Sequence, residues 1–111
     1  MTVNEMITKC DLEIINIGEK NAEITGVYCC DLLSVVMGKA FQGCAWVTVM
    51  GNINSIAVAS LADISCIILS DTANLDETAM AKSKQQGVTV LKSKLPIFET
   101  ALAIHNACEN A

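Results

Sequence analysis

The sequence predicts a single small α/β domain with a mainly parallel sheet flanked by helices. Three observations lead to this fold class. From residue 44 onward, apolar strand-like runs alternate with helical segments, which is the signature of right-handed βαβ units. The 111 residues leave room for one domain. The chain has no internal repeat, low-complexity stretch or linker, so the expected domain spans residues 1–111.

The first third of the chain is expected to form two helices and two strands. These elements are a helix from residue 3 to about residue 10, strands over 12–17 and 24–30 around a polar turn at 18–21, and a brief helix over 32–37. Thr2 and Glu5 have the spacing of a capping box, which starts the first helix. Asp31 is expected to cap the second helix, and Gly38 is expected to end it.

The remaining elements alternate regularly. They are a strand over 44–50, a helix from about 53 to 63, a strand over 66–69, a polar helix opened by residues 74–77, a strand over 88–91 and a final helix. Residues 44–50 are continuously apolar, as in a strand buried on both faces. Asn52 or Asn54 can cap the helix that follows. Gly87 closes the polar helix, and Pro96 suits the first turn of the last one.

The charge balance argues against binding to nucleic acid or to a membrane. The formal net charge is −5, and all seven basic residues are lysines with no basic stripe. Residues 40–62 carry no charge, but polar residues interrupt this stretch, so it falls short of a transmembrane span. The first residues contain an early acid and no apolar signal core. We therefore expect a cytoplasmic protein.

The six cysteines are expected to be small core residues with reduced thiols. They occur without any C-x-x-C pair, and no secretory signal places them in an oxidising compartment. The usual spacing of zinc or iron–sulfur ligands is also missing. We expect no metal and no cofactor.

The composition predicts an apolar surface that a partner covers. The chain is 52% hydrophobic and 17% charged, and a small domain with so few charges cannot coat itself with polar groups. A second copy is the simplest partner, so we expect a homodimer.

No group of residues has the pattern of a catalytic site. His105 is the sole histidine, and no neighbouring residue in the sequence is placed to orient it as a general base. Ser34 and the cysteines stand outside any nucleophile elbow. No phosphate-binding loop follows Gly38-Lys39, because the next residue is Ala40. We expect the chain not to be an enzyme.

Several segments resemble the DRTGG-domain family. The resemblance is carried by the runs that begin at Ile24 (ITGVY), Asp31 (DLLSVVM), Ala45 (AWVTV), Asn52 (NINSIAVA) and Cys66 (CIIL). It implies a fold like the N-terminal domain of HPr kinase/phosphorylase and, more distantly, that of the Mur ligases. Residues 21–27 keep Thr25 and Gly26 but lack the Asp-Arg start and the second glycine of the namesake motif.

The loop after the apolar strand at residues 44–50 is the candidate ligand site. Parallel sheets leave a ligand crevice beyond the carboxyl ends of their strands, and a helix N-terminus there favours an anion. A side chain at Gly51 would block the approach of such a ligand. The candidate residues are Thr25, Ser34, Thr48, Gly51, Asn52, Asn54 and Ser55. Thr25 and Ser34 are included mainly because of the family resemblance.

The alternative interpretation of this loop is purely structural, with Asn52 and Asn54 capping a helix and Gly51 allowing a turn. Two hypotheses for function follow. One is a regulatory ligand-binding module for a nucleotide-like or other anionic metabolite. The other is a module that dimerises or docks on a larger enzyme and binds no small molecule.

Overall fold

The computed structural model describes residues 1–110 and has ten elements of secondary structure. In chain order they are α1 (Val3–Lys9), β1 (Glu13–Asn16), β2 (Gly26–Cys29), α2 (Leu33–Lys39), β3 (Cys44–Thr48), α3 (Ile53–Leu61), β4 (Cys66–Leu69), α4 (Glu77–Gln86), β5 (Val90–Lys92) and α5 (Ile97–Glu109). The predicted alternation of strands and helices is confirmed, with boundaries that differ by one to three residues at most ends.

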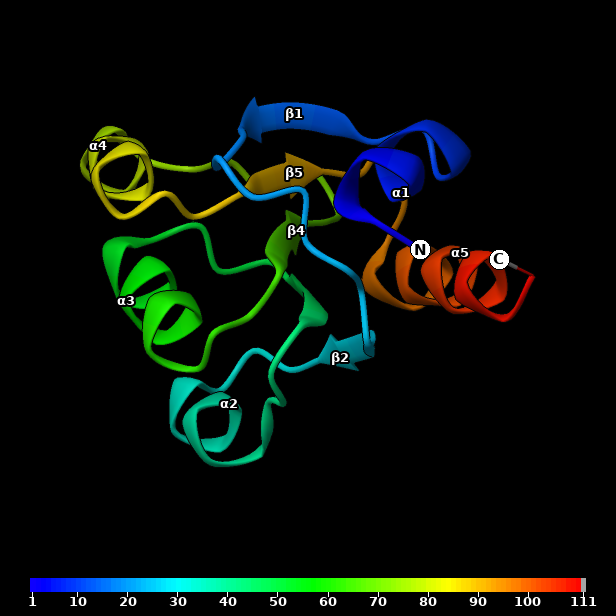
Figure 1. Ribbon diagram of the computed structural model, residues 1–111. Coiled ribbons are helices and arrows are strands. Elements are labelled where there is room, and N and C mark those ends of the chain that lie inside the picture. The colour runs from blue at the N-terminus through cyan, green and yellow to red at the C-terminus, as the bar shows by residue number, and fades with distance from the viewer. Residues whose placement is uncertain (111) are drawn as a thin grey trace.

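The five strands form one sheet in the order β1-β5-β4-β3-β2. Strands β2 to β5 are parallel, while β1 pairs antiparallel with β5 at the edge. Figure 1 shows α2, α3 and α4 on one face of the sheet and α1 and α5 on the other. We call the edge where β2 to β5 begin the amino edge, and the edge where they end the carboxyl edge.

The two faces of the sheet carry separate apolar cores because side chains alternate along each strand. Trp46, Ile67 and Val90 point toward α2, α3 and α4. Val47 and Ile68 point toward α1 and α5. All five residues of β3 are buried, so the expectation of a strand covered on both faces is confirmed.

The helix starts follow the sequence in part. The capping box of Thr2 and Glu5 is present at α1. Asn52 caps α3 by accepting a hydrogen bond from the N–H of Ser55. Asn54 lies inside the first turn instead. The polar helix α4 begins later than residue 74, because Asp76 supplies its cap.

Two expectations for α2 are wrong. Leu32 occupies the N-cap position, with no side-chain hydrogen bond, because the Asp31 carboxylate is turned toward β3. Gly38 lies within the last turn of α2 and does not end the helix, which continues through Lys39. Gly87 does end α4, in the left-handed conformation with φ of 68°.

No helix in the part of the chain that the structure describes combines the length and apolar character needed to span a bilayer.

Candidate functional site

Most of the predicted site residues meet at the carboxyl edge. Thr48 is the last residue of β3, residues 51 and 52 form the loop, and Asn54 and Ser55 lie in the first turn of α3. Ser34 is also at this edge, exposed in the first turn of α2. The loop therefore lies beyond the carboxyl end of β3, as the sequence predicts.

The polar groups of this loop are largely occupied by the protein itself. The Thr48 hydroxyl donates to the Asp31 carboxylate at 2.6 Å, and the N–H of Val49 donates to the same oxygen at 3.0 Å. Asn52 Oδ1 accepts from the N–H of Ser55 at 3.1 Å. Asp31 thus places a negative charge directly beside the expected anion site, which weakens its attraction for an anion.

Gly51 has a structural role that the sequence did not indicate. A Cβ at this position would lie 2.1 Å from the backbone oxygen of Asn74. The carbonyl of Gly51 also accepts a hydrogen bond from the N–H of Asp76 at 3.1 Å. The glycine allows two loops to pack together. The group that comes close to Gly51 is the Asn74 carbonyl, so the glycine is explained without a ligand.

Thr25 is not part of this group. It precedes β2, so it lies at the amino edge, at the opposite end of the sheet from the loop. Its hydroxyl donates to the carbonyl of Gln42 at 2.7 Å, and its N–H donates to the carbonyl of Gly43. The structure brings Thr25 to a different feature, a cleft.

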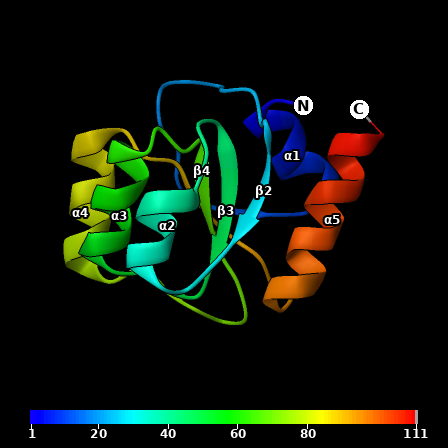
Figure 2. The ribbon, with the colours of Figure 1, turned by 90° about the horizontal axis from the view of Figure 1, so that it is seen from below.

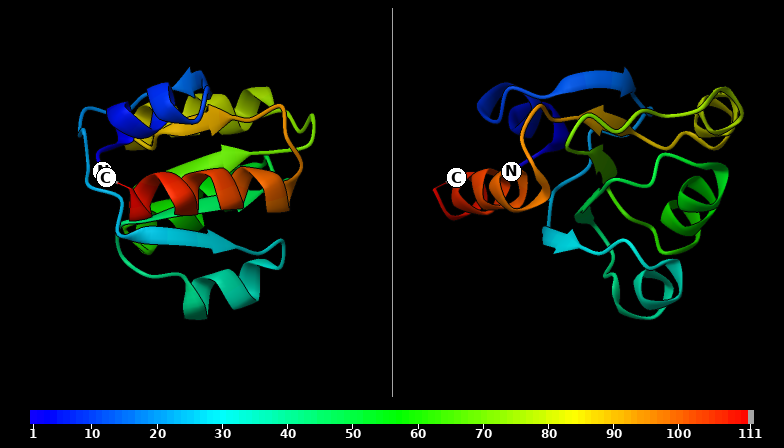
Figure 3. Two further views of the ribbon diagram at one scale, coloured as in Figure 1. Left: turned by 90° about the vertical axis from the view of Figure 1, so that its right-hand side faces the viewer. Right: turned by 180° about the vertical axis from the view of Figure 1, so that it is seen from behind.

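This amino-edge cleft has a volume of about 900 Å³. It lies between the segment that joins β1 to β2 and the ends of α3 and α4. We call residues 17–25 the strap, because they cross the amino edge from one side of the sheet to the other (Figure 3, left). The charged residues that line the amino-edge cleft are Glu19, Lys20, Glu23, Asp63 and Lys84.

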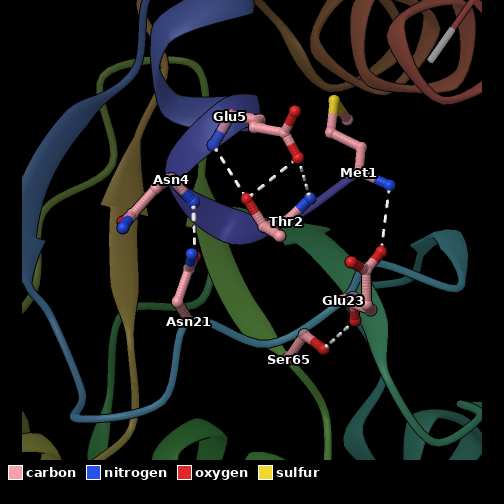
Figure 4. A network of polar contacts seen from close by, with 7 residues as sticks. All are labelled: Met1, Thr2, Asn4, Glu5, Asn21, Glu23 and Ser65. Carbon is pink, nitrogen blue, oxygen red and sulfur yellow. Dashed lines mark hydrogen bonds and ion pairs between the residues drawn. The ribbon is translucent and has the colours of Figure 1, made fainter.

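The strap is held in place by polar contacts with the start of the chain and with Ser65, the residue before β4 (Figure 4). The backbone N–H of Asn4 donates to Asn21 Oδ1 at 2.9 Å. Glu23 forms an ion pair with the amino group of Met1, and its carbonyl accepts from the Ser65 hydroxyl at 2.9 Å. These contacts fix one wall of the cleft relative to the sheet.

The electrostatics of the cleft favour a ligand that offers hydrogen-bond donors. Helices α3 and α4 both end at this edge, and the last carbonyl groups of a helix carry partial negative charge. The lining has three carboxylates against two lysine side chains. One of these carboxylates, Asp63, is oriented by the amide group of Gln42, which donates to it at 2.7 Å.

Sequence reasoning missed most of this cleft. Its polar residues follow no motif, because they come from a strap and from two helix ends that are far apart in the chain. A relevant feature of the sequence is the polar turn predicted at residues 18–21, for which the sequence indicates no segment to pack against.

Burial suppresses the nucleophilic character of the Cys29 and Cys66 thiols. Desolvation by the surrounding chain, followed by the nearby Asp31 carboxylate, raises the pKa of Cys29. Complete burial raises the pKa of Cys66 strongly. Because the thiolate is the reactive form, a raised pKa disfavours nucleophilic chemistry. His105 is exposed on α5, away from the cleft. Among residues 1–110, no three histidine, cysteine or acidic side chains converge to hold a metal ion.

Comparison with known proteins identifies the fold. No protein-family model matches the chain, and no curated protein matches it in sequence. Among solved structures, it is similar to the CBS and DRTGG domains of the regulatory region of Clostridium perfringens pyrophosphatase, complexed with the activator diadenosine tetraphosphate. The TM-score is 0.76 at 13% identity, over 93% of this chain and 45% of that one.

This similarity supports a DRTGG-like α/β fold, as the sequence resemblance implies. The chain spans less than half the length of the pyrophosphatase structure. Membership of the DRTGG family and likeness to HPr kinase stay predictions.

Proposed function

We propose that this chain is a non-catalytic regulatory domain that binds a small polar ligand in the amino-edge cleft. The cleft itself carries the proposal. Its volume of about 900 Å³ is in the range of small-molecule sites, and its walls present carboxylates, amides and helix-end carbonyls. Among the described residues that line it there is no histidine or cysteine to act as base or nucleophile.

The regulatory part of the proposal is supported by the similar structure, in which such a domain belongs to the regulatory region of an enzyme. Binding of a metabolite to a domain of this kind can bias a partner enzyme without any chemistry in the domain itself. Docking on a larger enzyme is therefore included in the proposal.

A thermal-shift screen of cationic, neutral and anionic metabolites tests the ligand. A ligand present at about a hundredfold above its Kd stabilises a protein by about 2.7 kcal/mol, which is readily detected. We expect at least one polar compound to raise the Tm of the wild type. Failure of every compound in a broad screen would leave the cleft without a function as a ligand site.

Two tryptophan variants of α3 locate the binding. Ser60 lines the cleft at the exposed end of α3, so Ser60→Trp fills the entrance and should abolish the ligand-induced shift. Ala57 is exposed on the same helix but outside the cleft, so Ala57→Trp should keep the shift. If Ser60→Trp binds as well as the wild type, the site lies elsewhere.

The same screen addresses the predicted nucleotide-like or anionic ligand at the start of α3. Asn54→Asp would place a negative charge in the first turn of that helix and weaken an anion bound there. A ligand whose shift is lost in Asn54→Asp and kept in Ser60→Trp would favour that loop over the cleft.

Large exposed apolar side chains favour a second candidate function, self-association. Leu61 is 75% exposed, Phe98 is 70% exposed and Leu32 is 60% exposed. These three residues lie on different elements, so the prediction rests on the charged fraction of only 17%, which leaves apolar surface for a second copy to cover. We expect the chain to be a homodimer, and light scattering at tens of micromolar (about the range where weak dimers form) measures its mass. A monomer mass would contradict this prediction.

A further inference from the structure

The helices that follow the strands change from one face of the sheet to the other at one place. Strands β2, β3 and β4 each lead into a helix on the same face, as Figure 2 shows for α2, α3 and α4. After β5 the chain turns to the opposite face and forms α5. The loops that leave β4 and β5 therefore diverge, and ligands in open α/β sheets bind where neighbouring loops diverge in this way.

Two serines follow the diverging strands directly. Ser70 comes after β4 and Ser93 after β5, and the pairing of Leu69 with Lys92 makes them neighbours across the sheet. Ser70 donates its N–H to the carbonyl of Thr48, so the strand geometry continues through it. Side-chain alternation then places Ser70 on the face that carries α5, with Cys66 and Ile68.

The contacts of Ser93 confirm that its side chain lies on the face of the sheet that carries α5. Its hydroxyl lies 2.7 Å from the hydroxyl of Thr100 on α5, and it accepts a hydrogen bond from the N–H of Leu95. The Thr100 hydroxyl also donates to the carbonyl of Leu95. Ser93 and Thr100 are both buried and both satisfied.

Ser70 is the exception in this group. Its side chain is completely buried, yet its hydroxyl has no hydrogen-bond partner among residues 1–110. A buried hydroxyl without a partner is costly, and such groups in native proteins mark a missing ion, water or ligand. The N–H of the next residue, Asp71, donates to the carbonyl of Leu95, which places Ser70 beside the start of α5.

The first turn of α5 offers further donors. Pro96 is the N-cap residue and forms no side-chain cap, so the N–H groups of Ile97, Phe98 and Glu99 receive no capping side chain. This helix has 13 residues, and Phe98 and Glu99 in its first turn are exposed. Lys94 adds a positive charge in the loop, whereas Asp71 and Glu99 add negative charges nearby.

We propose that a small oxyanion, either free phosphate or the phosphoryl group of a metabolite, binds between Ser70 and the first turn of α5. Ser70 donates its hydroxyl hydrogen, and the free N–H groups of the helix donate to the other oxygens. Reaching Ser70 requires the hydrogen bond between Asp71 and Leu95 to open. The site is independent of the amino-edge cleft, which lies at the other edge of the sheet.

Nuclear magnetic resonance of the ¹⁵N-labelled chain tests this site with inorganic phosphate as the probe and chloride at matched ionic strength as the reference. We expect saturable shifts of the amide signals of Ile97, Phe98, Glu99 and Asp71. Ser70→Ala should weaken phosphate binding about tenfold or more, since it removes a hydrogen bond to a charged group. In the absence of phosphate, the same variant should unfold at a higher urea concentration than the wild type.

Ser83→Ala is the matched control. Ser83 is also a buried serine, but it lies on α4 and its hydroxyl donates to the carbonyl of Met80. This variant should leave phosphate binding unchanged and should not gain stability. Repeating the titration with a nucleoside monophosphate identifies the source of the phosphoryl group. Equal shifts with both compounds support recognition of free phosphate, and shifts with the nucleotide alone support a larger ligand.

Three results would overturn the proposal. One is the absence of saturable shifts in residues 97–99 with either compound. Another is phosphate binding by Ser70→Ala that is as tight as in the wild type. The third is shifts confined to Ile53 and Asn54, which would assign the anion to the start of α3.

Discussion

Replacing Trp46 by alanine should remove about 3–5 kcal/mol of the free energy of unfolding. Trp46 lies in the middle of β3 and is completely buried against the helices α2, α3 and α4. Its indole N–H donates to the carbonyl of Cys30 at 2.9 Å, which ties the end of β2 to β3. The variant loses both the apolar volume and this donor. The total free energy of unfolding of a small domain is only about 5–15 kcal/mol, so much of the stability of this domain depends on the Trp46 side chain.

Urea unfolding followed by far-ultraviolet circular dichroism measures the loss, since the variant lacks the fluorescent tryptophan. Trp46→Phe separates the two contributions, because it keeps most of the apolar volume and should lose about 1–3 kcal/mol through the unpaired carbonyl. Phe98→Ala is the control at an exposed aromatic residue and should change stability by about 0.5 kcal/mol or less. A loss below about 1 kcal/mol in Trp46→Ala would show that β3 is not the centre of the core.

The elements of this fold could be predicted from the sequence because hydrophobic periodicity records burial. Apart from Thr48, residues 44–50 and 66–69 are all apolar, and the structure places β3 and β4 in the middle of the sheet with helices on both faces. The cap at Thr2 and the end of α4 at Gly87 could be predicted for a different reason, since each depends on an interaction between residues close in the sequence. Asp31 could not be predicted, because its carboxylate bonds to Thr48, which is distant in the sequence.

The position of the candidate site depended on information that periodicity lacks. The sequence indicates which strand ends in a polar loop, but it does not indicate the face on which each helix returns. The loop at residues 51–55 lies between connections that all leave toward one face, whereas the loops after β4 and β5 leave toward opposite faces. A serine directly after each of these two strands, at positions 70 and 93, was the signal that the sequence did contain.

The amino-edge cleft could not be predicted from the sequence for a related reason. Its walls come from the strap and from the carboxyl-terminal ends of two helices, and these segments meet only when the sheet order is known. Thr25 was predicted as a ligand residue, and it does line a cleft, but at the opposite edge from the loop to which it was assigned. Whether Thr25 binds a ligand stays a prediction that the Ser60→Trp comparison addresses.

Replacing Gly51 by alanine should destabilise the protein by about 1–3 kcal/mol or more, because the added methyl group has no space. The new Cβ would lie 2.1 Å from the oxygen and 2.9 Å from the carbon of the Asn74 carbonyl group, and backbone atoms cannot rotate away. The displaced loop leads into Asp76, which caps α4 through the N–H of Ala79. The substitution should therefore also loosen the start of α4.

Gly38→Ala is the matched control, with an expected effect of opposite sign. Gly38 lies inside α2, and no atom lies within 4 Å of the position that its Cβ would take. Glycine within a helix costs about 0.5–1 kcal/mol relative to alanine, so this variant should be more stable than the wild type. Urea unfolding of the two variants gives both signs in one experiment. Equal effects would contradict the close packing of Gly51 on Asn74.

The stability of Gly51→Ala also determines how a loss of ligand binding in Gly51 variants is interpreted. The sequence predicted that a side chain at Gly51 would block a ligand, so loss of binding in Gly51→Val would have supported a site there. Because the structure already fills the space beside Gly51 with Asn74, such a variant should lose binding through partial unfolding wherever the ligand sits. Hydrogen exchange separates the two causes. Faster exchange of the α4 amides in Gly51→Ala without any ligand would assign the effect to folding, and unchanged exchange would restore Gly51 as a ligand contact.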